Sequence, residues 1–277
     1  MIRPMAVLCG AALVAGLAAC GGEPERKPLP SGIVMHVDQT RLERMTRHVF
    51  VRVENNTERR LTVTGFVLTS PRFKQVTWKG DESMAAGEQA DLEFTMPAGR
   101  CGDGVKASVR LTYRLGDSAE RVSVGKADDP YRQIALMLGR DCARTTLAKA
   151  AKLTVGTPTI DGSGPDSVLR LPITLTPTGK RDDVRFGGFE STPLFRQADD
   201  SPVGVDQPIS STQKTQLVMS VVPARCDPHA LAEDKVGRLF GMRVMAPGLP
   251  DDSWFYLPLD HDQREAFYAY FHTSCGV

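Results

Sequence analysis

Pro97-Ala98-Gly99-Arg100-Cys101 and Pro223-Ala224-Arg225-Cys226 are one motif written twice, with a single residue deleted from the second copy. A second repeated motif lies upstream in each half. Ser70-Pro71-Arg72-Phe73-Lys74-Gln75 matches Thr192-Pro193-Leu194-Phe195-Arg196-Gln197 at an offset of 122 residues. Two motifs repeated in the same order predict a duplicated domain.

Weaker matches extend the repeat toward both ends of each half. Leu92, Phe94 and Met96 correspond to Leu217, Met219 and Val221 at an offset of 125. Val122 and Val124 correspond to Phe255 and Leu257 at 133, and so does the apolar pattern of residues 129–142 to that of 262–275. The offset grows by eight after Cys226, so the second copy carries about eight extra residues before Trp254.

Apolar residues alternate with polar ones through most of each copy. This period of two is typical of strands with one buried face and one wet face. In the first copy the residues expected to be buried are Val49, Val51, Val53, Leu61, Val63, Gly65, Val67, Ala90, Leu92, Phe94, Met96, Val105, Ala107, Val109, Leu111, Tyr113, Val122 and Val124. In the second copy the pattern predicts strands over residues 169–175, 184–189, 217–221, 239–244 and 254–257.

Each copy ends in a helical pattern, over residues 130–140 and 263–273. Ile134, Met137 and Leu138 share one face of the first helix. We therefore predict an all-β chain of two tandem immunoglobulin-like β-sandwiches, each closed by a short C-terminal helix and one disulfide. The expected domains are residues 32–145 and 153–277, with 143–152 continuing the first helix as a stiff connector.

Four cysteines remain once Cys9 and Cys20 are set aside as parts of an export signal. Four cysteines allow three pairings. Because duplication makes Cys101 equivalent to Cys226 and Cys142 to Cys275, only Cys101–Cys142 and Cys226–Cys275 leave both copies alike. A zinc site is the alternative, but the spacings contain no C-x-x-C pair.

Residues 1–19 form an export signal with Arg3 and a run of 13 apolar residues, 7–19, too short to span a bilayer. The run ends in Leu17-Ala18-Ala19-Cys20-Gly21, which resembles the bacterial lipobox. That resemblance implies lipidation of Cys20 and a place on the extracytoplasmic face of the cell membrane. The alternative is an ordinary signal peptide that contains a cysteine. Residues 20–31 hold three prolines and are expected to form a lipidated tether.

Composition and motifs exclude several classes of function. The 277 residues hold 34 basic and 33 acidic side chains, and removal of Arg3 with the signal balances them. A neutral chain is a poor nucleic-acid binder, so no nucleic acid is expected as a partner. The sequence contains no G-x-x-x-x-G-K-[ST], H-E-x-x-H or G-x-S-x-G motif, so we expect no catalytic residues, no cofactor, no metal and no enzyme.

One polar segment has no counterpart in the first copy, because it coincides with the extra residues. It contains Asp227, His229, Glu233 and Asp234, which could bind a divalent cation or a basic peptide. A solvated loop with Asp227 capping a turn is the alternative interpretation of these four candidate ligand-binding residues.

The lipobox, the tether, the paired repeats and the run Arg225-Cys226-Asp227-Pro228-His229 together resemble uncharacterised secreted or lipidated proteins of high-GC Gram-positive bacteria. The resemblance implies no activity. We expect a membrane-anchored, non-catalytic binding or scaffolding module with an envelope protein as partner. The alternative is a metal-handling or solute-binding lipoprotein that uses residues 227–234. An enzyme acting on the envelope is the weakest hypothesis.

Overall fold

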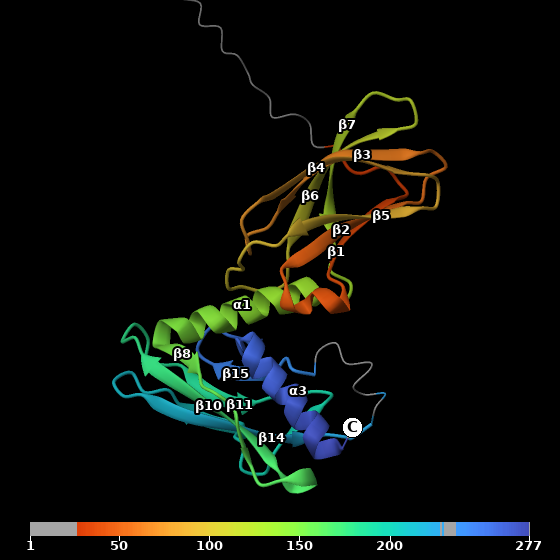
Figure 1. Ribbon diagram of the computed structural model, residues 1–277. Coiled ribbons are helices and arrows are strands. Elements are labelled where there is room, and N and C mark those ends of the chain that lie inside the picture. Colours follow the sequence, from red (N-terminus) through yellow and green to blue (C-terminus); the bar gives the residue numbers. More distant parts are fainter. Residues whose placement is uncertain (1–26, 228, 230–236, 277) are drawn as a thin grey trace, which may run out of the picture.

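The computed structural model describes residues 27–227, 229 and 237–276, which form two β-sandwiches joined by one helix (Figure 1). The predicted fold class is confirmed: both sandwiches are immunoglobulin-like, and each carries a helix and a disulfide. Among the described residues, no helix is long and apolar enough to cross a membrane.

The first sandwich packs a three-stranded sheet on a four-stranded sheet, with antiparallel neighbours in both. The smaller sheet has the order β1 (Ile33–Asp38), β2 (His48–Asn55), β5 (Gln89–Thr95). The larger has the order β4 (Val76–Met84), β3 (Leu61–Thr69), β6 (Ala107–Leu115), β7 (Arg121–Ala127). A short 3-10 helix, η1 (Arg41–Met45), connects β1 to β2.

The second sandwich repeats this arrangement. One sheet has the order β12 (Phe195–Gln197), β14 (Thr215–Pro223), β10 (Val168–Pro177), β8 (Ala151–Val155), and β9 (Thr159–Asp161) also pairs with β10. The other has the order β13 (Val203–Pro208), β11 (Arg185–Phe189), β15 (Gly241–Met245), β16 (Trp254–Tyr256). The 3-10 turn η2 (Gly164–Asp166) precedes β10. The order β13-β11-β15-β16 matches β4-β3-β6-β7 strand for strand, as duplication requires.

Equivalent β-bulges interrupt the third strand of each copy, between Val63 and Gly65 in β3 and between Phe186 and Gly188 in β11. A bulge adds one residue and so reverses the faces of the side chains after it. The expectation that Val67 is buried is therefore wrong: Phe66 and Leu68 enter the core, and Val67 is only half-buried.

The expectation for β7 is also wrong, because its register places the two valines outside. Val122 lies opposite Thr112 and Val124 opposite Arg110, on the outer face of β6. Ser123 lies opposite Leu111 and is buried, whereas Val122 is 49% exposed.

Two α-helices close the copies, and both exceed their predicted lengths. α1 spans Gln133–Ala150 and α3 spans His261–Cys275. The two halves of α1 belong to different cores. Ile134, Met137 and Leu138 pack in the first core, and Ala143, Leu147 and Ala150 pack in the second. The boundary expected between residues 145 and 153 thus falls within α1 and the start of β8.

The predicted disulfides are both present, Cys101–Cys142 with a Cα–Cα distance of 4.9 Å and Cys226–Cys275 with 5.1 Å. Each ties a helix to the segment that comes after the repeated Pro-Ala motif. The copies differ beyond the helical cysteine. α1 continues to Ala150, while α3 ends at Gly276, whose φ of 67° is left-handed and suits glycine.

A pair of equivalent hydrogen bonds locates the extra residues of the second copy. The Ser70 hydroxyl donates to the Val105 carbonyl at 2.6 Å, and the Thr192 hydroxyl donates to the Gly237 carbonyl at 2.7 Å. Cys101 to Val105 is four positions, whereas Cys226 to Gly237 is 11. Most of the insertion therefore lies between Cys226 and Gly237. Of the predicted site residues, Glu233 and Asp234 lie outside the described part of the chain.

The start of the described chain lies along β7. The Val124 amide donates to the Lys27 carbonyl at 2.9 Å, Pro28 makes a parallel bridge to Val124, and Leu29 packs against the first core. The last residues of the expected tether thus belong to the sandwich. The export signal and Cys20 lie outside the described residues.

Candidate functional site between the two sandwiches

A cleft of about 1120 Å³ opens where the sandwiches meet. We call it the interdomain cleft. One wall is α1, a second is formed by residues 102–107 and 126–129 of the first sandwich, and the third is the 250–254 loop of the second. Because α1 packs in both cores, the two walls it joins are held by one rigid element (Figure 1). Ligand pockets commonly occur at such domain interfaces.

Two strained residues lie on this cleft. Among the described residues that are not glycine, only Lys106 (φ 47°) and Arg132 (φ 57°) have a positive φ, and both line it. The left-handed region is costly for a side chain with a Cβ, and such residues tend to gather at functional sites. Asp129 fixes the turn at Arg132, since its carboxylate accepts hydrogen bonds from the amides of Ile134 (3.4 Å) and Ala135 (2.7 Å) at the start of α1.

The cleft presents charges of both signs in equal number. Its basic lining residues are Arg72, Lys106, Lys126, Arg132 and Arg140. Its acidic lining residues are Asp103, Asp128, Asp129, Asp251 and Asp252. An apolar strip of α1, with Leu136 41% exposed, lies among them. A mixed surface of this kind suits another protein better than a uniformly charged polymer.

Arg140 lies at the junction of the two sandwiches. Its guanidinium is 5.4 Å from the ring centroid of Trp254 and 4.9 Å from that of Tyr256. Burial is the main cause that lowers the pKa of Arg140. Among the described residues no carboxylate makes an ion pair with it, so its contacts across the domain boundary are with aromatic faces.

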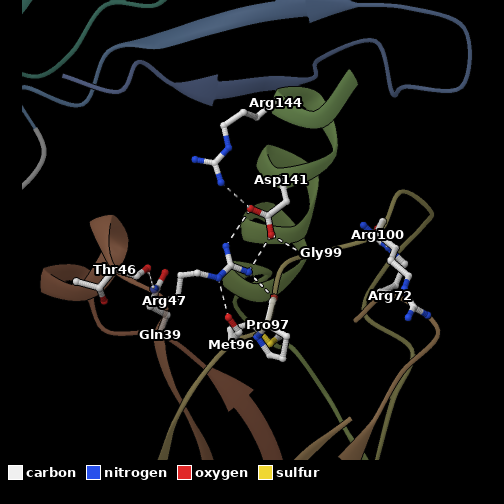
Figure 2. A network of polar contacts seen from close by, with 10 residues as sticks. All are labelled: Gln39, Thr46, Arg47, Arg72, Met96, Pro97, Gly99, Arg100, Asp141 and Arg144. Carbon is white, nitrogen blue, oxygen red and sulfur yellow. Dashed lines mark hydrogen bonds and ion pairs between the residues drawn. The ribbon is translucent and has the colours of Figure 1, made fainter. Parts of the chain in front are cut away.

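A buried network anchors α1 to the first sandwich (Figure 2). Both nitrogens at the end of the Arg47 side chain lie 2.9 Å from the Asp141 carboxylate, whose side chain is only 8% exposed. Arg47 also donates to the backbone carbonyls of Met96, at 2.6 Å, and Pro97. The Gly99 amide donates to Asp141 at 2.7 Å, which leaves this buried carboxylate fully bonded.

The second copy uses a neutral pair at the corresponding place. Ser274, like Asp141, directly precedes the helical cysteine, and Ser167, like Arg47, directly precedes the second long strand of its sandwich. The two buried serine hydroxyls lie 3.0 Å apart. The charged version therefore belongs only to the helix that joins the domains.

Of the four residues predicted to bind a ligand, two are described. The Asp227 carboxylate accepts a hydrogen bond from the His229 amide at 2.8 Å, which is the turn-capping role that the sequence allowed as an alternative. The described part of the chain contains no group of three or more His, Cys, Asp or Glu side chains arranged to hold a metal ion.

Sequence reasoning missed the interdomain cleft. Its lining comes from segments that lie up to about 180 residues apart, and no local pattern joins them. One signal was present: Arg132 comes shortly after Asp129-Pro130 at the start of a helical pattern, where a capping turn is expected.

No known protein family and no curated protein matches the chain. Solved structures give only faint similarities. They include red sea bream transglutaminase (TM-score 0.24, 9% identity, 84% of this chain and 32% of that one) and the BSP domain of a biofilm-associated protein (0.26, 8%, 85% and 60%). An exo-chitosanase of Amycolatopsis orientalis gives 0.19 and 15% identity over 80% of this chain and 26% of that one. The chain thus spans between a quarter and three fifths of these proteins, and at such scores the similarities carry no argument.

Proposed function

We propose that the chain is a lipid-anchored, extracytoplasmic binding module that holds an envelope protein in the interdomain cleft. The observation that carries the proposal is α1, a single helix that is part of both cores and forms one wall of the cleft. A cleft between rigidly joined domains is pre-formed, so little ordering opposes binding.

The anchor in this proposal is Cys20 in the lipobox-like sequence. Lys27 already contacts β7, so only residues 21–26 remain as a free spacer. A fully extended spacer from Cys20 to Lys27 reaches about 25 Å. The bridge between Pro28 and Val124 is parallel, so the chain enters from the end of the first sandwich where β7 begins. This arrangement would hold the first sandwich close to the membrane and present the cleft farther out.

Site-specific photocrosslinking in cells tests the cleft. A photoreactive amino acid at Leu136 should crosslink to a partner, while one at Ile160, which is similarly exposed on β9, should not. The Leu136 crosslink should disappear in Gly139→Trp and persist in Gly139→Ala. Gly139 lines the cleft and has open space where a Cβ would stand, so both variants should fold. Crosslinking that is the same at both positions, or unaffected by Gly139→Trp, would exclude the cleft as the binding site.

Labelling with a palmitate analogue tests the anchor. Cys20→Ala should abolish the label, because the resemblance to the lipobox assigns the acyl chains to that thiol. Cys9→Ala is the matched control and should be labelled like the wild type, since Leu8 before it is too large for the motif. Equal labelling of the two variants would refute the lipobox assignment.

A further inference from the structure

A second, smaller hollow of about 220 Å³ lies where η1, α1 and the 255–258 segment meet. Four of its lining residues are arginines, so we call it the arginine pocket: Arg44, Arg47, Arg140 and Arg144. It draws on both domains, because Arg44 and Arg47 come from the first sandwich and the 255–258 segment from the second. It shares Arg140 with the interdomain cleft but opens separately.

Positive charge is in excess in the arginine pocket. Asp141 is the only acidic residue of its lining, so four guanidinium groups face one carboxylate. Arg47 takes up that carboxylate at 2.9 Å, and Arg144 reaches it at 3.5 Å. The neighbouring Glu43 carboxylate bonds the Thr46 hydroxyl and reduces the excess without removing it.

The arginines also act on one another. Arg44 and Arg47 both contribute to the lowered pKa of Arg140, after the larger effect of burial. Like charges in a partly buried hollow repel each other, and an anion bound among them would relieve that repulsion.

The pocket is built before any ligand arrives. The buried Gln39 side chain donates to the carbonyls of Glu43 (2.6 Å), Thr46 (3.2 Å) and His48 (3.2 Å), which fixes the η1 turn that carries Arg44 (Figure 2). Arg47 is held by the Asp141 network, and Arg140 lies over two aromatic rings. Pre-positioned guanidinium groups lose little entropy when they bind.

We propose that the arginine pocket binds a phosphate group, either as the free ion or as a small phosphate monoester. Guanidinium groups match phosphate oxygens in paired, charge-assisted hydrogen bonds, and a dianion offsets more of the excess charge than one carboxylate does. The ligand would contact both domains across α1. This inference goes beyond the proposed function, because it concerns a different hollow and a small anion rather than a protein partner.

Calorimetry on the full-length protein in detergent, in a chloride buffer free of phosphate, tests the inference. Inorganic phosphate should bind at one saturable site, and acetate at the same ionic strength should bind at least about tenfold more weakly. Glycerol 3-phosphate distinguishes the two sources of the anion: tighter binding than phosphate indicates an ester, and weaker binding indicates the free ion. The absence of a saturable phosphate isotherm up to about 10 mM, or equal affinity for acetate, would overturn the proposal.

Charge-matched variants assign the site. Arg44→Gln and Arg144→Gln should each weaken phosphate binding about tenfold, as expected for the loss of one charge-assisted contact. Arg121→Gln removes an exposed charge at the far end of β7 and should leave the affinity unchanged. Equal weakening in all three variants would show a nonspecific charge effect and contradict the pocket. Arg144 is 62% exposed, so its replacement should not disturb folding even if that of Arg44 does.

The two proposals can fail separately. Gly139→Trp blocks the interdomain cleft, and Gly139 does not line the arginine pocket, so phosphate binding should survive in this variant. Loss of the crosslink at Leu136 with intact phosphate binding supports both proposals. Phosphate binding that disappears in Gly139→Trp would instead place the anion in the cleft.

Discussion

The Asp141 carboxylate shows how one residue can determine where a helix docks. It lies inside the molecule, and it is acceptable there because Arg47 and the Gly99 amide satisfy both of its oxygens. A buried pair of this kind adds little net stability relative to apolar residues, but removal of one partner leaves an uncompensated charge. Its role is therefore to fix the position of α1 on the first sandwich.

Asp141→Ala should lower the free energy of unfolding by about 3 kcal/mol, at the lower end for a broken buried pair because Arg47 keeps some contact with water. Asp91→Ala is the control. It removes the same group from the exposed pair with Arg52 and should cost less than about 1 kcal/mol. Urea unfolding measures both. Similar losses in the two variants would contradict the anchoring role of Asp141.

The pairing of Arg47 with Asp141 could not be read from the sequence. The two residues are 94 positions apart, and neither lies in a recognisable motif. Alternation did predict most of the buried side chains, such as Val49, Val51 and Val53, because that pattern is local. It failed at Val67, where one bulged residue reversed the faces, and at Val122, where the register with β6 decided.

At the scale of elements, α1 and α3 show how a closing helix became a connector. Both helices carry a cysteine bonded to the same part of their sandwich. α3 stops at Gly276, whereas α1 continues with Ala143, Leu147 and Ala150 facing the second core. The apolar face of the continuation was visible in the sequence. That both cores would share it was not, because this depends on how the second sandwich docks.

The start of α1 carries a pH-dependent cap at Asp129. Burial is the main cause that raises its pKa, so the folded chain holds this proton more tightly than the unfolded chain. Stability from this group is therefore greatest at low pH and is lost as the pH rises through the two pKa values, from about pH 4 upward. Asp129→Asn keeps an acceptor oxygen for the Ala135 amide and removes the titration.

The free energy of unfolding of Asp129→Asn, relative to wild type, should thus become more favourable between pH 4 and pH 7. A difference that stays constant or changes in the opposite direction would show that the carboxylate is not buried as described. Asp117→Asn, which lies in the exposed β6–β7 turn, is the control and should show no such trend.

The second disulfide should stabilise α3 more than any other helix. Replacing Cys226 and Cys275 together by serine should cost about 2–4 kcal/mol, the range for a native disulfide. Hydrogen exchange should show faster exchange across α3, while the half of α1 in the first core keeps its protection. Equal loss of protection in both helices would mean that the two sandwiches unfold together.

At the scale of the molecule, a duplicated sandwich has become a two-domain frame around one helix. Repeated motifs predicted the duplication, and the duplication predicted the disulfides, since both rest on comparison of the chain with itself. The interdomain cleft and the arginine pocket arise from contacts between the copies, such as Arg140 with Trp254 and Tyr256. A repeat carries no information about such contacts, because they exist only once.

Both binding sites depend on α1 holding the two sandwiches in one fixed arrangement. Spin-labelled amino acids introduced at Glu82 on β4 and Ile160 on β9 would report the distance between the sandwiches by pulsed electron resonance, without altering the native cysteines. We expect one narrow distance distribution, which Thr145→Pro should broaden by breaking α1 at an exposed position. A broad or two-peaked distribution in the unaltered chain would contradict the fixed arrangement.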